Sequence, residues 1–251
     1  MSRWSKTLPP ALALAALCIV TASCNTSNTT QARFVNALQD TVQYGTALDI
    51  NFNGNKYFSD IGFQEYLPAT GYTTVPAGGS TVAALETGTS TQISSNNIFL
   101  NPGSRYTMVL TGFATNDADV ALISALDTTT TPSTGKVEFR VIHASPSAPS
   151  GLDVYIVPIG SSGSLAPPAT ITNLAYPSAS KYVTLDYNSN RANGANYTIF
   201  VTATGTTSPI LLTQSLSAGT LGMGAIRTVI LTDQQNIDQL NPLVIVLNDF
   251  N

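Results

Sequence analysis

Residues 32–251 carry the same series of short segments twice, in the same order. The six matching pairs are 32–37 with 139–144, 48–52 with 152–156, 72–75 with 182–185, 86–89 with 203–206, 100–103 with 216–219, and 106–111 with 227–232. The spacing between partners drifts along the chain, which places insertions between the matching segments. Because self-similarity in a fixed order is the signature of a duplicated unit, the sequence predicts two copies of one domain.

Both copies have the periodicity of β-strands. In 137–141 apolar and polar residues alternate, so that one set would face a core and the other water. Some runs are more continuously apolar, as strands buried on both faces tend to be: 106–110, 197–201 and 243–247. Turn-forming pairs such as Asn53-Gly54 separate the runs, and no long helical pattern follows Val20. The pattern predicts an all-β chain of two sandwiches, each with seven or eight strands.

The repeat also predicts the domain boundaries. The first sandwich would cover 32–126 and the second 136–251. The segment between them, 127–135, consists mainly of Thr with Pro and Gly. Since nothing in it can build a core, we expect it to be the linker between the domains.

The N-terminus has the pattern of an export signal. Two basic residues precede an apolar run that is too short to span a membrane comfortably, so 1–23 is expected to be a cleaved signal peptide. Small residues before Cys24 resemble a bacterial lipobox, which would make Cys24 the lipidated N-terminus and 24–31 a polar tether. Ordinary cleavage near Ala22 or Ser23, leaving a free thiol, is the alternative. Asn25 after the Cys favours, by resemblance to Gram-negative lipoproteins, the outer membrane.

The charge balance excludes several classes of function. Only 10% of residues are charged, with 10 Lys and Arg against 14 Asp and Glu. Nucleic-acid binding requires a basic surface, so no nucleic acid is expected as a partner. The single His excludes multi-histidine metal sites, and nothing in the sequence indicates a cofactor. We therefore expect a partner that is neutral and forms hydrogen bonds.

One stretch of the second copy resembles a known family. Residues 140–149 read RVIHASPSAP and 152–155 read LDVY, which is similar to the opening of the domain of unknown function 4397, DUF4397. The first copy keeps the frame but has Asn36 where the second has His143. The resemblance implies tandem immunoglobulin-like antiparallel β-sandwich domains, following a signal peptide, in an exported bacterial envelope protein. It implies no activity, because the family has none established.

A calcium loop is the first chemical candidate. Asp49, Asn51, Asn53 and Gly54 match the opening of such a loop, with Asp60 at its twelfth position. Asp60 replaces the expected Glu, and Leu48, Ile50 and Phe52 alternate as core residues would. We therefore expect a strand followed by an Asn-Gly hairpin turn, and no metal site.

Catalysis by Ser and His is the second candidate. His143 lies near Ser145, Ser147 and Asp153, but no G-x-S-x-G elbow presents a nucleophile. We expect His143 to end a strand and to hydrogen-bond the Ser-Pro turn. The turn that begins at His143 is also the candidate contact loop for a partner. It consists of His143, Ser145, Pro146 and Ser147.

Two further sets of charged residues have open interpretations. Arg33 and Arg140 occupy the same position in the two copies. Each is expected to pair with an acid across its sheet, and an anion-binding site between the copies is the alternative. Asp117 and Asp119 are expected to form a solvated turn, with a calcium site as the alternative.

These observations predict a non-enzymatic lipoprotein anchored in the bacterial envelope. It would be a surface or periplasmic binding or adhesion module, with a glycan or an envelope protein as partner and the membrane bound only through the lipid. The alternative is a structural spacer or assembly subunit that meets its own kind through sheet edges. A hydrolase is a third, less favoured hypothesis.

Overall fold

The computed structural model describes residues 28–39, 47–114, 119–159, 165, 168–188, 195–217, 224–233 and 243–249. All the regular elements in this part of the chain are strands. The expected signal peptide and Cys24 lie outside the described residues. Within the described ranges, no helix is long and apolar enough to cross a membrane.

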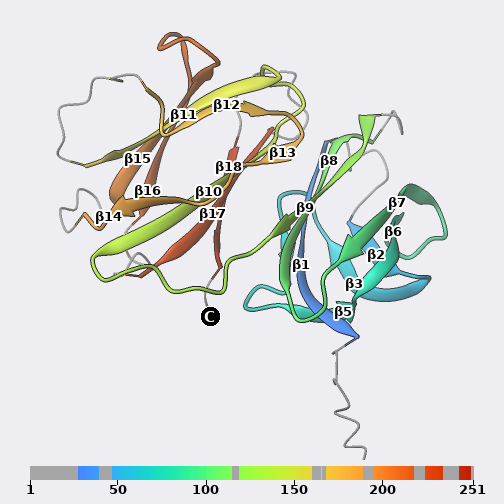
Figure 1. The fold of residues 1–251 in the computed structure, drawn as a ribbon. Helices are drawn as coiled ribbons and strands as arrows, with labels where there is room; N and C mark the ends of the chain where they lie inside the picture. Colours follow the sequence, from blue (N-terminus) through green and yellow to red (C-terminus); the bar gives the residue numbers. More distant parts are fainter. Residues whose placement is uncertain are drawn as a thin grey trace, which may run out of the picture.

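The first domain is a sandwich of two sheets (Figure 1). One sheet has the order β4-β1-β8-β9, and β5 also pairs with β1. The other has the order β3-β2-β6-β7. The strand bounds are β1 Thr29–Gln39, β2 Leu48–Phe52, β3 Asn55–Ile61, β4 Tyr66–Leu67, β5 Thr73–Pro76, β6 Gly78–Glu86, β7 Gln92–Leu100, β8 Arg105–Phe113 and β9 Ala121–Leu126.

The second domain repeats this topology strand for strand. Its sheets have the orders β13-β10-β17-β18, with β14 on β10, and β12-β11-β15-β16. The strand bounds are β10 Lys136–Ala144, β11 Gly151–Pro158, β12 Ile171–Ala175, β13 Ser178–Ala179, β14 Val183–Asp186, β15 Ala195–Ala203, β16 Ile210–Ser217, β17 Ile226–Thr232 and β18 Leu243–Asn248. The all-β double sandwich is thus confirmed. Two details differ from expectation: the described part of each domain has nine strands, and β1·β8 and β10·β17 pair in parallel.

The alternation in the sequence builds a separate core in each sandwich. In β2, Leu48, Ile50 and Phe52 point inward and join the first core. The strand then turns at Asn53 and Gly54, both at positive φ, which is the conformation that an Asn-Gly hairpin turn requires. In the second core, Phe139 of β10 packs edge-on against Tyr197 of β15, with ring centroids 5.3 Å apart.

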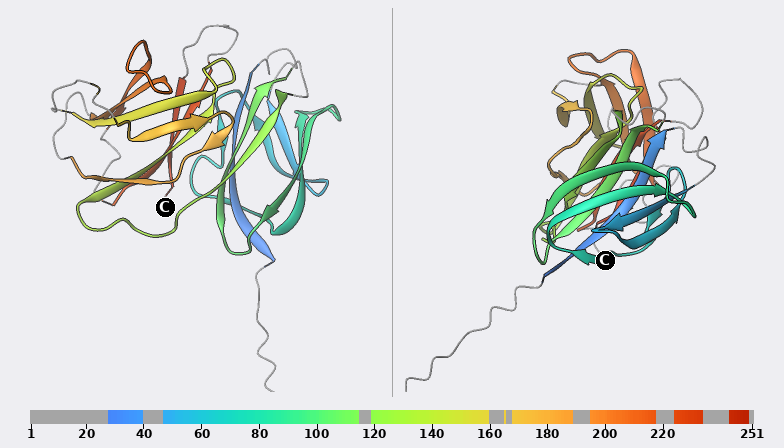
Figure 2. Two further views of the ribbon diagram at one scale, coloured as in Figure 1. Left: turned by 45° about the horizontal axis from the view of Figure 1, so that its top comes forward. Right: turned by 90° about the vertical axis from the view of Figure 1, so that its right-hand side faces the viewer.

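A third apolar cluster lies between the domains. The sheets that contain β1 and β10 pack against each other, as Figures 1 and 2 show. The cluster contains Val35, Ala37, Val109, Ile123 and Ala125 from the first domain, and Ile142, Ala144, Ile230 and Leu247 from the second. As a result β8 and β17 are buried on both faces, so the continuously apolar run at 106–110 has the environment expected for it.

The structure places the ends of the first sandwich outside its predicted limits. β1 begins at Thr29, and Thr30 is buried with its hydroxyl 2.7 Å from the Ser104 carbonyl oxygen. The last residues of the expected tether are therefore part of the sheet. Asp127, the first residue of the expected linker, is also buried. Thr30 and Asp127 both make hydrogen bonds within the fold, and the matching segments of the repeat do not include either residue.

Candidate functional site

The two equivalent arginines lie at the contact between the domains. Arg33 is buried, and its Nε atom donates to the Thr107 hydroxyl at 2.9 Å. Its Nη1 atom donates to the carbonyl oxygen of Asn248 at 2.7 Å, and its Nη2 atom forms an ion pair with Asp249. Both Asn248 and Asp249 belong to the second domain. We expected an acid from the same sheet: Asp127, which follows β9 of that sheet, forms the longer ion pair with Arg33 at 3.9 Å, and Asp249 of the other copy forms the closer one.

Arg140 makes the equivalent contacts in the opposite direction, from the second domain to the first. Its Nε atom donates to the Thr228 hydroxyl at 3.1 Å, and its Nη1 atom donates to the Leu126 carbonyl oxygen at 2.9 Å. Its Nη2 atom lies 2.5 Å from the carboxylate of Asp127 in the first domain. Each domain thus inserts an arginine beside the other domain's aspartate. The guanidinium groups are engaged in joining the domains, so this cluster does not form the anion-binding site that was the alternative.

A tyrosine completes each half of this cluster. The Tyr72 hydroxyl donates to Asp127 at 2.7 Å, and that of Tyr182 donates to Asp249 at 2.8 Å. The Arg140 guanidinium lies 4.7 Å from the centroid of the Tyr182 ring. Burial raises the pKa of both tyrosines, and the neighbouring aspartates raise it further. Burial alone would lower the pKa of Arg33, but Asp249, with Tyr72 and Asp127, raises it.

His143 holds the Ser-Pro turn after β10. Its Nε2 atom lies 2.9 Å from the carbonyl oxygen of Pro149, and its Nδ1 atom accepts the Ser145 amide at 3.4 Å. A neutral imidazole with the proton on Nε2 satisfies both contacts. The Ser145 and Ser147 hydroxyls donate to Asp233, and the Ser147 amide does so at 2.9 Å. The Ser145 hydroxyl is therefore oriented by Asp233, whereas His143 contacts only the Ser145 amide.

Burial limits which residues of the candidate contact loop can meet a partner. His143 and Ser145 are fully buried, so they cannot contact a partner in this structure, contrary to our expectation. Pro146 and Ser147 are half-buried and reach the surface. The hydrogen bonds explain the difference, because they draw the first half of the loop into the domain.

The calcium-loop candidates do not converge on one point. The Asp49 carboxylate forms an ion pair with Lys56 and accepts the Asp60 amide at 3.1 Å. Burial would raise the pKa of Asp49, but these hydrogen bonds lower it. Asn53 bonds instead to β6, with its Oδ1 atom 2.9 Å from the Thr81 amide. Asn51 lies on β2 and the Asp60 side chain is exposed. In the described residues, no group of three or more His, Cys, Asp or Glu could hold a metal ion.

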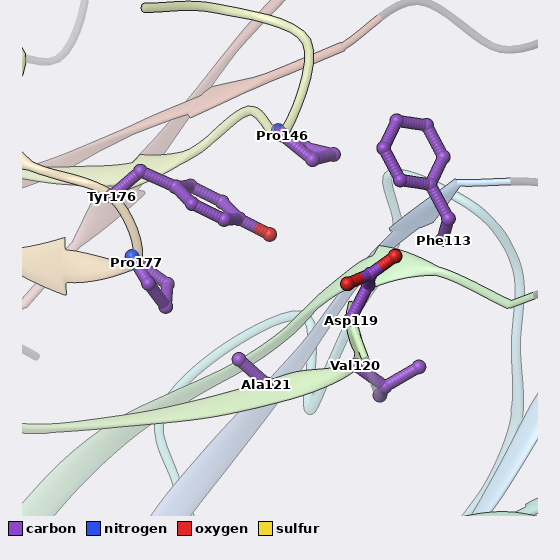
Figure 3. Close-up of a pocket in the computed structure, with 7 residues that line it drawn as sticks. All are labelled: Phe113, Asp119, Val120, Ala121, Pro146, Tyr176 and Pro177. Carbon is purple, nitrogen blue, oxygen red and sulfur yellow. The ribbon is translucent and has the colours of Figure 1, made fainter. Parts of the chain in front are cut away.

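A pocket of about 470 Å³ opens between the two domains (Figure 3). Phe113, Asp119, Val120 and Ala121 line it from the first domain. Pro146, Tyr176 and Pro177 line it from the second domain. In Figure 3 the Tyr176 hydroxyl points across the pocket towards the Asp119 carboxylate. The Tyr176 ring also packs edge-on against His143, with centroids 5.3 Å apart, so the Ser-Pro turn supports one wall. Asp117, the other member of the expected pair, lies outside the described residues.

A second hollow lies on the outer face of the sheet that contains β7. It has a volume of about 410 Å³ and is lined by Asn53, Gly79, Ser80, Thr81, Asn97, Ile98 and Phe99. Phe99 is 69% exposed, the largest exposure of the big apolar side chains in the described ranges. Its register partner on β6 is Gly79, which has no side chain to cover the ring. We refer to Phe99, Asn97, Thr81 and Asn53 as the outer-face platform.

Sequence reasoning missed the acids and the exposed ring. Extending the last repeat match by one strand aligns 122–127 with 244–249, which would have paired Asp127 with Asp249. Aligning Thr111 with Thr232 likewise places Asp233 at the position of Gly112. The exposure of Phe99 left no signal, since alternation alone does not tell which face of a sheet is covered.

The comparisons with known proteins concern the family and the fold. The family model of the domain of unknown function, DUF4397, matches residues 30–155, which include the whole first domain and the start of the second. No curated protein matches the chain. Among solved structures, the chain aligns with CBMbc (family CBM26) from Eubacterium rectale Amy13K, solved in complex with maltoheptaose, at 13% identity and a TM-score of 0.27, over 87% of this chain and 96% of that one. A TM-score this low supports no conclusion about function. The family match spans half of the chain, and the protein therefore belongs to the DUF4397 family.

Proposed function

We propose that the protein is a non-enzymatic glycan-binding module of the bacterial envelope, anchored by a lipid on Cys24. The pair of domains would display its binding surface away from the membrane. The observation that carries the proposal is the outer-face platform, where one exposed aromatic ring lies among uncharged polar side chains.

The platform has the chemistry that a neutral sugar requires. The apolar face of a pyranose ring packs on an aromatic ring, and its hydroxyl groups need both donors and acceptors. Phe99 supplies the ring, and the Asn97 and Thr81 side chains, themselves 2.8 Å apart, supply polar groups beside it. Every side chain that lines this hollow among the described residues is uncharged. A neutral glycan thus fits this surface better than an ionic ligand.

The platform is pre-ordered by contacts within the sheet. Asn53 is held by the Thr81 amide, and its Nδ2 atom lies 3.4 Å from the Ser80 hydroxyl. Asn97 and Phe99 lie two residues apart on β7 and therefore share one face. Because Asn53, Thr81 and Asn97 already have hydrogen-bond partners, a bound sugar would cost little ordering entropy at these polar side chains.

The second domain provides a matched control. Leu100 of β7 and Leu216 of β16 occupy equivalent positions in the repeat and are both buried, so Ser215 stands where Phe99 stands in the first domain. A glycan that binds through the ring should engage the first domain alone.

The test is a calorimetric titration of the full-length protein, extracted from membranes in detergent, with a panel of neutral envelope glycans. Recovery from the membrane fraction checks the anchor. We expect one glycan to bind, and Phe99→Ala to weaken it at least about tenfold, as expected for an aromatic anchor. Ser215→Ala should leave binding unchanged. If the Phe99→Ala variant bound the glycan as tightly as the unaltered protein does, the proposal would be refuted.

A further inference from the structure

The pocket between the domains differs in chemistry from the outer-face platform. Its walls carry two aromatic rings, Phe113 and Tyr176, and two proline rings, Pro146 and Pro177. Among the described residues that line it, Asp119 carries the only carboxylate and no side chain is basic. The lining is therefore apolar on most sides and negative at one point.

The arrangement of these groups suits a positive charge. Figure 3 shows Tyr176, Pro146 and Pro177 facing Phe113 and Asp119 across the open space. Aromatic faces attract cations through their quadrupole, and a carboxylate nearby adds a direct electrostatic attraction. The volume of about 470 Å³ is ample for an ammonium group with its alkyl substituents.

We propose that this pocket binds an alkylammonium group, held by the Asp119 carboxylate against the rings of Phe113 and Tyr176. The group can belong to a lysine side chain of a peptide or to a free small amine, since both present the same chemistry. The site needs both domains, because neither contributes the rings and the carboxylate alone.

The neighbouring groups favour one charge in the pocket rather than two. Burial raises the pKa of Tyr176, a hydrogen bond with Thr111 opposes this in part, and Asp233 and Asp119 raise the pKa further, so the hydroxyl stays neutral at physiological pH. Asp119 is then the only charged side chain among the described residues of the lining. A monocation matches this charge, whereas an anion would meet the carboxylate.

The test compares two probes that differ in the charged group. The full-length protein is titrated in detergent with Nα-acetyl-lysine methylamide and with Nα-acetyl-norleucine methylamide, and binding is followed by ligand-observed NMR. We expect the lysine derivative to bind at least about tenfold more tightly at low salt, and its advantage to shrink at high salt as the charges are screened. n-Butylammonium in a third titration separates the two sources: binding as tight as that of the lysine derivative points to a free amine, and weaker binding to a peptide side chain.

Variants assign the effect to the pocket. Asp119→Asn should remove the preference for the lysine derivative, and Phe113→Leu should weaken it without altering the charge. Glu138→Gln is the matched control, because it removes a carboxylate outside the pocket. Equal binding of the two probes, or a preference that survives in Asp119→Asn, would overturn the proposal. If Asp119→Asn does not fold, Phe113→Leu decides: an unchanged preference overturns it.

Discussion

His143 lies at the end of β10, fully buried, with its Nε2 atom 2.9 Å from the Pro149 carbonyl oxygen. Asn36 occupies the same position in the first copy, where its Oδ1 atom accepts the Leu38 amide at 3.1 Å. The Nδ1 atom of His143 accepts the equivalent Ser145 amide. Both side chains thus cap the same backbone amide, two residues ahead. Turn geometry thus accounts for the hydrogen bonds of His143.

The histidine should make stability depend on pH. Burial lowers the pKa of His143, and the contacts with Pro149 and Asp233 offset this only in part. The unfolded state therefore binds a proton more readily, so the contribution of His143 is present above about pH 6.5 and is lost as the pH falls through the folded-state pKa. We expect His143→Asn, the residue of the first copy, to weaken this loss. Urea unfolding at pH 7.5 and pH 5.5 measures it, and an unchanged difference between the two pH values would contradict the assignment.

Gly112 is a strand position at which the two copies carry different residues. It lies in β8 at φ +118°, and a Cβ atom there would come within 2.0 Å of the Asp119 carbonyl oxygen. The equivalent residue in the second copy is Asp233, whose carboxylate holds Ser145 and Ser147. In the first copy the Asp119 backbone therefore lies close to this position, whereas the second copy carries the Asp233 side chain there. The interdomain pocket lies beside this divergence, since Asp119 lines it.

A methyl group at Gly112 should thus be costly. Gly112→Ala combines an unfavourable φ with a clash against backbone, so we expect it to destabilise the protein by about 2 kcal/mol or more. Gly79→Ala is the control, because nothing lies within 4 Å of its Cβ position and its φ is ordinary. Chemical denaturation compares the two. A Gly112→Ala variant as stable as Gly79→Ala would show that the Asp119 segment moves away easily.

The contact between the two domains is both apolar and ionic. The cluster between the sheets removes apolar surface of both domains from water. The reciprocal pairs Arg33–Asp249 and Arg140–Asp127 then join the first strand of each domain to the end of the other. A buried ion pair is costly to break, since the remaining charge stays away from water.

This arrangement predicts cooperative unfolding of the whole molecule. The original protein should unfold in one calorimetric transition. Asp249→Asn leaves Arg33 without its main partner, so we expect a loss of about 3–5 kcal/mol and a second transition as the domains separate. The double variant Arg33→Met, Asp249→Asn should recover part of that loss. Two transitions in the unaltered protein would contradict a single cooperative unit.

The amino-acid sequence alone predicts the repeat, the strands and the equivalence of Arg33 and Arg140. These depend on local rules, because alternation and turn residues act over a few neighbouring positions. The close pairing of each arginine with the other copy's aspartate emerges only from the three-dimensional fold, since Arg33 and Asp249 lie at opposite ends of the chain. The pocket at Asp119 and the exposed ring of Phe99 likewise depend on how sheets pack and which face remains uncovered. Repeated sequence therefore predicted two similar domains, whereas the packing of the sheets decided which groups meet between them and which face stays exposed.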